Sequence, residues 1–293
     1  MLNIHFIVNP IAGSGKHRLS ETLLQHYFEP QNYLITLKTS EYKSHASELT
    51  KASIQQHADI IVACGGDGTV NEVASLLVGT TIPLGIVPIG SGNGLANNLK
   101  IPTHLAEALE IIKKNQPTMI DVGCVNQRYF FSNIGFGFTA KVIEHYAASE
   151  KRTWRCYLKA CYKAFWAYYK KETVVMVIDD NIELRNPFLF FISNSNVMGY
   201  TMSLTPKASL KDGLLDVLIV PNISRLKMMY LGVLLLLKKP HALKEVRYYQ
   251  TTALNITQKG APIFSAQIDG EWSQTEAKST LVALKEKALN VLV

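Results

Sequence analysis

Hydrophobic and polar positions follow two different rhythms along the chain. In the first third, short apolar runs such as Ile60–Ala63 alternate with amphipathic stretches. Uninterrupted apolar runs are typical of strands buried on both faces of a parallel sheet, and amphipathic stretches predict helices. The predicted strands are Asn3–Val8, Tyr33–Leu37, Ile60–Ala63 and Leu84–Val87, and the predicted helices are His17–Phe28, Ser44–Gln56, Thr69–Val78 and Ser91–Leu99.

The rhythm changes after about Pro117, where β-type runs dominate and helices become few. We therefore expect a doubly wound α/β domain over residues 1–120 and a mainly antiparallel β domain over residues 121–293, with the last residues returning to the first domain. A ligand cleft is expected between the two. The later predicted strands are Met119–Val125, Tyr129–Ile134, Val174–Ile178, Phe188–Asn194, Leu215–Val220, Val246–Leu254, Ile263–Ile268 and Thr280–Leu284, with helices at Arg155–Tyr169 and Leu226–Leu237.

One apolar segment raises the question of a membrane. Met228–Leu237 is almost wholly apolar, but its ten residues are fewer than the ~20 needed to span a bilayer as a helix. The segment favours a buried helix over an interfacial helix docked on lipid. In either case we do not expect an integral membrane protein. The first residues, Met1–Val8, lack the basic region and cleavage site of a signal peptide and favour a strand.

Composition and charge narrow the class of protein. Among 293 residues, 47% are hydrophobic and 18% charged, which is enough apolar material for a sizeable core. The net charge of +7 suits nucleic acid, anionic lipid headgroups or phosphorylated small molecules. No basic-aromatic platform for nucleic acid is visible. The four cysteines form no C-x-x-C pair, so we expect reduced thiols in a cytoplasmic protein.

A glycine-containing loop, Asn9–Lys16 (NPIAGSGK), joins the first predicted strand to a helix. Its glycines let backbone N–H groups approach a phosphate, and Lys16 and the helix N-terminus add positive potential. It is not a Walker A loop, because Pro10 replaces the first glycine and His17 replaces the final Ser or Thr. Nor is it a dinucleotide motif, because Arg18 occupies the third glycine position.

Two more such loops follow predicted strands. In Gly65–Glu72 (GGDGTVNE), three glycines surround Asp67 and leave the backbone open to a polyphosphate or its Mg²⁺, while Thr69 is expected to cap the next helix. Pro88–Gly94 (PIGSGNG) adds small and hydroxyl-bearing residues. Because ligands of doubly wound sheets bind at the carboxyl ends of strands, the three loops together predict one phosphate-binding site.

Acidic residues of the second half gather in Asp212–Asp216 and Gln267–Glu271. Each contains an Asp-Gly pair, which is typical of a hairpin turn. The alternative is that one carboxylate binds a metal ion and another deprotonates an attacking hydroxyl. The spacing alone does not decide between these hypotheses.

Taken in order, the motifs resemble the diacylglycerol-kinase catalytic-domain superfamily, which includes bacterial soluble lipid kinases and eukaryotic sphingosine and ceramide kinases. The set is more specific than any single member, and it extends over nearly the whole chain. The matching segments are Asn9–Lys16, Gly65–Val73, Pro88–Ala96, Ile120–Gly123, Ser132–Val142, Asp212–Val217 and Ile268–Glu271.

The resemblance implies an ATP-dependent lipid kinase that phosphorylates the hydroxyl of a diacylglycerol-like or sphingoid-like lipid. Asp269 matches the proposed general base, and Asp67 is its rival in the sphingosine-kinase branch. Asp212, with the carbonyls of Ser209 and Leu214, matches the structural Mg²⁺ site of the family. A second Mg²⁺ travels with ATP. The positions matching the nucleotide site are Asn9, Ser14, Lys16, Thr39, Gly65, Gly66, Asp67, Gly68, Thr69, Val70, Asn71, Glu72, Ser91 and Asn93.

Two departures from the family pattern bear on the lipid. Gly90–Ala96 is more similar to the sphingosine and ceramide kinase branch, and Thr139 stands where many relatives have aspartate. An NAD kinase, which shares the GGDGT turn, and a non-catalytic regulator that senses nucleotide or lipid are the alternatives. The expected partners are a lipid substrate and transient contact with the inner face of the membrane, without nucleic acid, as a monomer or homodimer.

Overall fold

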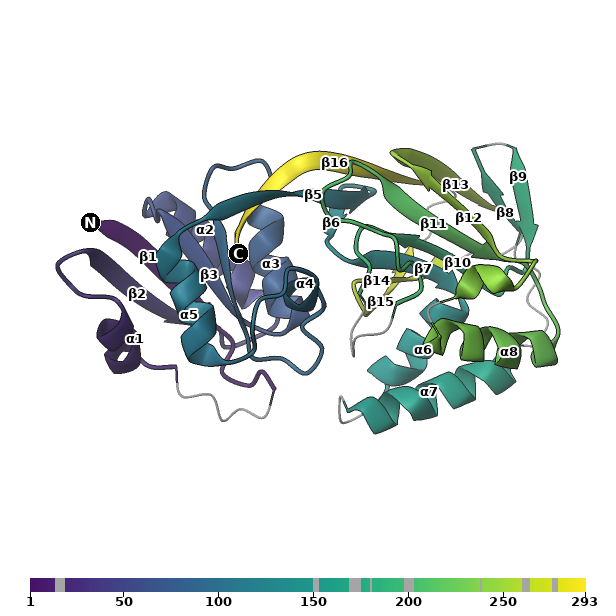
Figure 1. Cartoon of the computed structure of the whole chain (residues 1–293), viewed down its shortest axis with the longest axis horizontal. Helices are drawn as coiled ribbons and strands as arrows, with labels where there is room; N and C mark the ends of the chain where they lie inside the picture. The colour runs from purple at the N-terminus through teal and green to yellow at the C-terminus, as the bar shows by residue number, and fades with distance from the viewer. Residues whose placement is uncertain are drawn as a thin grey trace. The chain divides into compact units, whose positions relative to one another are not determined.

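The computed structural model describes residues 1–13, 19–149, 153–168, 175–179, 181–197, 203–237, 239–259, 264–275 and 279–293. The chain divides into two compact units (Figure 1). Unit 1 comprises Met1–Val122 and Glu286–Val293, and unit 2 comprises Gly123–Lys285. The chain passes from unit 1 to unit 2 along strand β5 (Pro117–Val125) and returns along β16 (Ser279–Leu292).

Unit 1 contains a parallel sheet in the order β2-β1-β3-β4, with the end of β16 beside β4 through the pair Val291 and Leu84. β3 and β4 are buried along their whole length, as the uninterrupted apolar runs predicted. The predicted doubly wound α/β domain is thereby confirmed. The four strands are β1 (Leu2–Val8), β2 (Tyr33–Thr39), β3 (Ile60–Gly65) and β4 (Leu84–Pro88).

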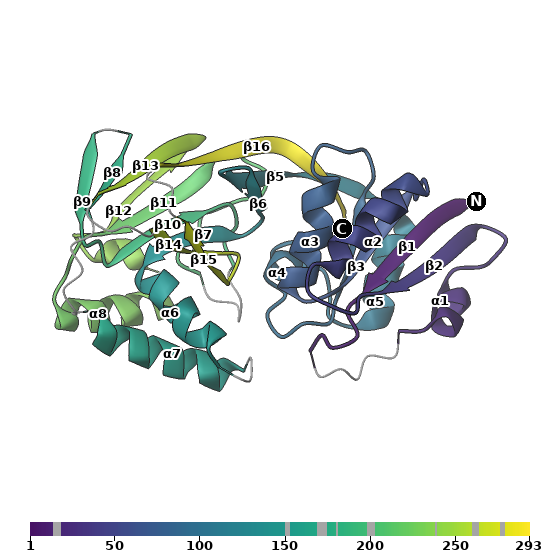
Figure 2. The same ribbon diagram turned by 180° about the vertical axis from the view of Figure 1, so that it is seen from behind.

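Helices cover both faces of this sheet. The two opposite views place α1 and α5 on one face and α2 and α3 on the other (Figures 1 and 2). α5, which was not predicted, buries Ala108, Leu109 and Ile112 at helical spacing. The helices are α1 (Glu21–Tyr27), α2 (His45–Gln55), α3 (Asp67–Leu77), α4 (Gly94–Asn98) and α5 (Leu105–Lys114).

Unit 2 is built on antiparallel strands, as predicted. One sheet has the order β12-β11-β10-β7-β14-β15. In the other, β13 lies between β16 and β8, β8 pairs with β9, and β5 pairs with β16 and β6. The strands are β6 (Arg128–Phe130), β7 (Asn133–Gly137), β8 (Val175–Ile178), β9 (Ile182–Arg185), β10 (Leu189–Ser193), β11 (Leu215–Val220), β12 (Arg247–Thr251), β13 (Ala253–Lys259), β14 (Phe264–Ile268) and β15 (Glu271–Thr275).

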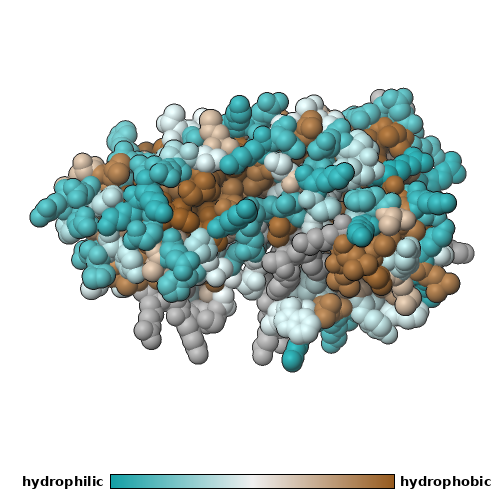
Figure 3. Space-filling model, viewed as in Figure 1, coloured by the Kyte–Doolittle hydropathy of each residue, from teal (hydrophilic) through white to brown (hydrophobic). Residues whose placement is uncertain are grey.

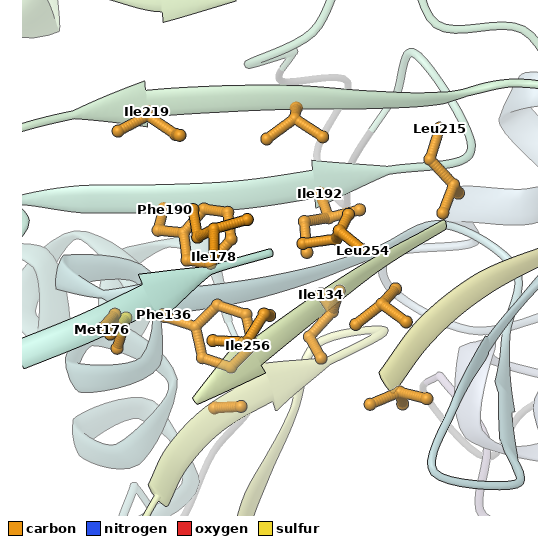
Figure 4. Close-up of a cluster of buried hydrophobic side chains, with 14 of the residues drawn as sticks. Ile134, Phe136, Met176, Ile178, Phe190, Ile192, Leu215, Ile219, Leu254 and Ile256 are labelled. Atoms are coloured by element: carbon orange, nitrogen blue, oxygen red, sulfur yellow. The ribbon is translucent and has the colours of Figure 1, made fainter. Parts of the chain in front are cut away.

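Alternation along β10 gives unit 2 two cores. Phe190 and Ile192 pack with Ile178 and Ile256 of the other sheet in the core between the sheets (Figure 4). Residues of the opposite parity pack instead toward α8 (Arg225–Leu236). Three helices therefore gather on one side of unit 2: α6 (Phe138–Ala147), α7 (Trp154–Ala167) and α8, followed by a short 3₁₀ helix at Pro240–Ala242.

Several predictions of individual elements were wrong. The single run predicted at Tyr129–Ile134 is two strands, β6 and β7, and the run Val246–Leu254 is divided between β12 and β13. The apolar helix predicted at Leu226–Leu237, which favoured a buried helix, is only half buried. It corresponds to α8, which buries Met228, Leu231 and Leu234 and exposes its other faces. No helix in the described part of the chain is long and apolar enough to cross a membrane.

Candidate functional site

The three glycine-containing loops of unit 1 lie against one another at the carboxyl ends of β1, β3 and β4. The Asn9 side chain donates a hydrogen bond from Nδ2 to Thr69 Oγ1, at 3.2 Å. A Cβ added at Gly90 would lie 2.3 Å from the Gly66 Cα, and one added at Gly13 would lie 2.2 Å from the Ile89 carbonyl oxygen. The convergence predicted from the order of strands and loops is therefore present, and it depends on glycines having no side chain.

The first loop begins with a turn around Asn9. The Asn9 backbone N–H donates to the Cys64 carbonyl at 2.9 Å, and its Oδ1 accepts from the Ile11 N–H at 3.1 Å. Thr39 ends β2 beside Val8 in the sheet register, so it lies at the same edge of the sheet. Ser14 and Lys16, which were predicted to bind nucleotide, lie outside the described residues.

The second loop runs directly into α3. The helix begins at Asp67, with Gly66 in an extended conformation at the N-cap and no side-chain cap. The first-turn N–H groups of a helix have no intrahelical partner and favour an anion. Thr69 was predicted to cap this helix, and that prediction was wrong: Thr69 lies in the first turn, buried beneath Gly65, where it accepts the bond from Asn9.

Val70 and Glu72, two other predicted residues of this loop, make contacts that stabilise the fold of unit 1. Val70 is buried with the core of unit 1, and the Glu72 carboxylate accepts a hydrogen bond from the Ser44 N–H at 3.2 Å. Asn71 lies on the same helix, where its Oδ1 accepts from the Ser75 hydroxyl at 3.3 Å. Gly66 and the Asp67 side chain are the parts of the motif that contact the third loop, and Gly65 lies over Thr69.

The third loop is closed by Asn93, which has a left-handed backbone with φ of 51°. Its Oδ1 accepts from the Gly90 N–H at 3.0 Å, and its Nδ2 donates to the Gly90 carbonyl at 2.8 Å. Asp67 Oδ1 accepts from the Gly94 N–H at 2.6 Å and so joins the second loop to the third. Ser91 is exposed at the tip of the loop. The helix predicted from Ser91 therefore starts only at Gly94.

Unit 2 holds the Asp269 carboxylate in a nest of backbone donors. Asp269 has φ of 48°, and its carboxylate accepts from the N–H groups of Phe131 at 2.8 Å, Ser132 at 2.8 Å and Asn133 at 3.0 Å. The Asp269 N–H donates in return to the Asn133 carbonyl at 2.9 Å. Three N–H donors stabilise a negative charge and also fix the turn between β6 and β7. The predicted base thus lies in a tightly held loop between β14 and β15.

The predicted metal ligands lie in a turn that leads into β11. Asp212 Oδ1 accepts from the Leu214 N–H at 3.1 Å, Gly213 has φ of 74°, and Ser209 Oγ accepts from the Lys211 N–H at 3.2 Å. Asp212 is exposed, so its carboxylate is open to a cation. Among the described residues there is no group of three or more His, Cys, Asp or Glu, so a metal ion here would need backbone carbonyl or water ligands besides Asp212.

A second carboxylate close to this turn was not among the predicted ligands. Asp216 is fully buried in β11; the Tyr248 hydroxyl donates to its Oδ1, as does Gln250 Nε2 at 3.3 Å. Its Oδ2 is buried with no hydrogen-bond partner in the described part of the chain. Burial raises the pKa of Asp216, the two donors oppose the rise, and the negative charge of Asp212 adds to it.

These surroundings fit a hard divalent cation. An exposed carboxylate and a buried carboxylate oxygen that has no donor among the described residues are the kind of oxygen ligands that Mg²⁺ favours. The sequence contained a signal for Asp216, because it ends the same D-G-L-L-D segment that begins with Asp212. Its burial followed from the strand pairing, which sequence spacing does not reveal.

Two family models match the chain, one for each part. A model described as "Diacylglycerol kinase catalytic domain" matches residues 3–125. A model described as "YegS C-terminal NAD kinase beta sandwich-like domain" matches residues 132–293, which is more than half of the chain.

Individual proteins resemble the chain over nearly its whole length. A protein named "Diacylglycerol kinase" from Staphylococcus saprophyticus is 25% identical over 280 residues, covering 91% of this chain and 88% of the relative. One of the same name from Staphylococcus aureus is 26% identical over 272 residues, covering 91% and 85%.

Solved structures have the same fold. A crystal structure from Bacillus anthracis superposes with a TM-score of 0.77 at 20% identity, covering 99% of this chain and 94% of that one. Another from the same organism, described as a diacylglycerol kinase, has a TM-score of 0.69 at 18% identity, covering 99% and 96%.

Proposed function

Because the chain belongs to the diacylglycerol kinase catalytic-domain superfamily, we propose that it transfers the γ-phosphoryl group of ATP to the hydroxyl of a diacylglycerol-like or sphingoid-like lipid. The observation that carries the proposal is the meeting of three glycine loops at one edge of the unit 1 sheet. Phosphoryl transfer needs positioned donors and neutralised charge more than covalent chemistry from the protein.

Unit 1 would hold the nucleotide. Backbone N–H groups of the three glycine-containing loops and the N-terminus of α3 would bind the phosphates, and Lys16 would add positive charge. Asp67 keeps the second and third loops together through Gly94. Mg²⁺ bound with ATP supplies further neutralisation of the phosphates.

Unit 2 would supply the metal site and the base. Asp212, with the carbonyls of Ser209 and Leu214, would hold the structural Mg²⁺, and we add Asp216 as a nearby carboxylate whose charge that ion would offset. Asp269 would take the proton of the lipid hydroxyl as the new oxygen–phosphorus bond forms and the bond to ADP breaks. Asp67 is the alternative base.

Replacing Asp269 by Asn tests the assignment of the base. Asn has one acceptor oxygen, so it cannot accept all three backbone N–H bonds, and a structural role by itself predicts a loss of stability. A base predicts in addition a fall of about 100-fold or more in kcat with KM for ATP little changed. The measurements are initial rates with labelled ATP across a lipid panel and the melting temperature of each variant.

The matched control is Asp179→Asn. Asp179 also has a left-handed backbone and accepts one backbone N–H, from Asn255 at 2.7 Å, in the turn between β8 and β9. We expect this variant to keep wild-type rates within about twofold. Wild-type turnover by Asp269→Asn would remove Asp269 from the mechanism and leave Asp67→Asn as the variant to examine.

A second candidate function is phosphorylation of NAD. The model that matches residues 132–293 describes a β sandwich like that of NAD kinases, whereas the model that matches residues 3–125 is the kinase domain of the lipid branch. The solubility of the labelled product separates the two functions.

A further inference from the structure

Exposed apolar side chains gather on two helices of unit 2. Of the 17 large hydrophobic residues exposed in the described part of the chain, ten lie on α7, on α8 or at the C-cap of α8. Monomeric soluble proteins rarely expose large contiguous apolar patches without a function. The ten are Trp154, Leu158, Tyr162, Trp166, Leu226, Met229, Tyr230, Val233, Leu236 and Leu237.

The contribution of α7 is a stripe with a spacing of four residues. Trp154, Leu158, Tyr162 and Trp166 follow one another along one face of the helix, each at least half exposed. The opposite face of α7 buries Ala160 and Ala164, which pack with Val142 of α6. This stripe is therefore the face of α7 that packing within the described part of the chain leaves exposed.

The contribution of α8 comes from a helix that is apolar on all sides. Its buried face contacts the strands of the second core of unit 2, while Leu226 and Leu236 are each 79% exposed. Figure 3 shows the resulting hydrophobic patch over α8. The guanidinium of Arg225, at the start of α8, lies 4.8 Å from the ring centre of Trp166, so the two helices form one continuous surface. We call it the α7–α8 surface.

The charge on the α7–α8 surface has one sign. The two helices contain five basic residues, Arg155, Lys159, Lys163, Arg225 and Lys227, and no Asp or Glu. Lys227 is paired with Glu245, which lies outside both helices. The basic residues of α7 are exposed and directly follow Trp154, Leu158 and Tyr162 in the sequence, and Arg225 lies over the ring of Trp166.

We propose that the α7–α8 surface docks on a bilayer containing anionic lipids. We infer further that this bilayer supplies the lipid substrate, and this second inference rests on the function proposed above. Apolar and aromatic side chains would enter the boundary between headgroups and acyl chains, while Lys and Arg bind the phosphates. Trp and Tyr suit this boundary because one end of each ring system is polar.

Charge favours a bilayer over a second copy of the chain as the occupant. In a two-fold symmetric dimer the same surface faces itself, so the basic residues of one copy would lie near those of the other. Neither helix offers a carboxylate to compensate them. An anionic membrane compensates the three exposed basic residues of α7 at once.

Binding to vesicles, measured without ATP, tests the proposal independently of catalysis. The probe is flotation with vesicles of phosphatidylglycerol and phosphatidylcholine in equal parts, compared with vesicles of phosphatidylcholine alone. We expect wild type to bind the anionic vesicles more tightly, with a loss of about fivefold in partitioning for each cation removed in Lys159→Gln and Lys163→Gln. Leu226→Gln combined with Leu236→Gln is expected to lower partitioning by about tenfold or more.

The matched control is Leu34→Gln combined with Leu281→Gln, two leucines 53% and 55% exposed outside the α7–α8 surface, for which we expect wild-type partitioning. Phosphorylation of a short-chain diacylglycerol in detergent micelles should stay unchanged in all variants. Wild type that does not bind anionic vesicles, or a Leu226/Leu236 variant that binds as wild type does, overturns the proposal. The proposal is also overturned if wild type is a dimer and the Leu226/Leu236 variant is a monomer that still binds vesicles as wild type does. Binding without kinase activity would instead overturn only the proposed function.

Discussion

At the scale of single residues, three Asx side chains with left-handed backbones fix the turns of unit 2. Asn126, Asp179 and Asp269 each donate their backbone N–H to a carbonyl, and each accepts the N–H of that same residue on a side-chain oxygen. Asn and Asp tolerate positive φ better than other residues with a Cβ. Asp269 differs because its carboxylate accepts two further N–H bonds, so its charge is held more tightly than a hairpin turn requires.

A buried histidine predicts how stability depends on pH. His5 in β1 is 3% exposed, and its Nδ1 has no partner in the described part of the chain. Burial lowers the pKa of His5, and the positive charge of Lys38 adds to the effect. The unfolded chain takes up a proton below the ordinary pKa of 6.5, whereas the folded chain does so only at a lower pH, so stability is present above pH 6.5 and falls as the pH drops below it.

His5→Leu should remove this contribution. Over pH 5 to 6.5 we expect wild type to lose up to about 1.4 kcal/mol of unfolding free energy per pH unit more than the variant does. Urea unfolding at several pH values measures the difference. Parallel pH profiles for the two proteins would show that His5 is not the source of this pH dependence of stability.

At the scale of elements, glycines decide how closely the three loops approach. Gly90→Ala would place a methyl group 2.3 Å from the Gly66 backbone, so one loop must move. We expect a loss of about 1–3 kcal/mol in stability and weaker Mg·ATP binding, because the donors on both loops would shift. Thermal unfolding and calorimetric titration with Mg·ATP measure the two effects.

Gly232→Ala is the control for this change. Gly232 lies within α8 with no atom within 4 Å of an added Cβ, so alanine should stabilise the helix slightly, by about 0.5–1 kcal/mol. Wild-type stability and nucleotide affinity in Gly90→Ala would contradict the close packing of the second and third loops.

Elements with a strong local signal were predictable from sequence, and those defined by their neighbours were not. β3 is an uninterrupted apolar run, β11 is apolar apart from Asp216, and both were found where predicted. α6 was missed because it follows β7 directly, with Gly137 as an N-cap that has no side chain to mark the start of the helix. The apolar run of α8 indicated a helix but not its exposed face, since burial depends on which strands and helices pack beside it.

At the scale of the whole molecule, the fold class and the order of motifs could be predicted because both are written along the chain. The length of β16 could not: its predicted end was Leu284, but the strand continues to Leu292 through the polar residues Lys285–Lys287. Lys287 has φ of 47° and its N–H donates to the buried Asp121 carboxylate at 2.7 Å. This contact joins segments 166 positions apart, which no local pattern reveals.

The central claim is that the chain transfers phosphate from ATP to a lipid. The most direct test incubates the protein with γ-³²P-labelled ATP, Mg²⁺, NAD and a total lipid extract, separates organic from aqueous products, and identifies the labelled molecule by mass. We predict label in the organic phase on a glycerolipid or sphingoid lipid, and its loss when Mg²⁺ is chelated. Label confined to an aqueous dinucleotide, or no transfer to any lipid of the extract, would contradict the claim.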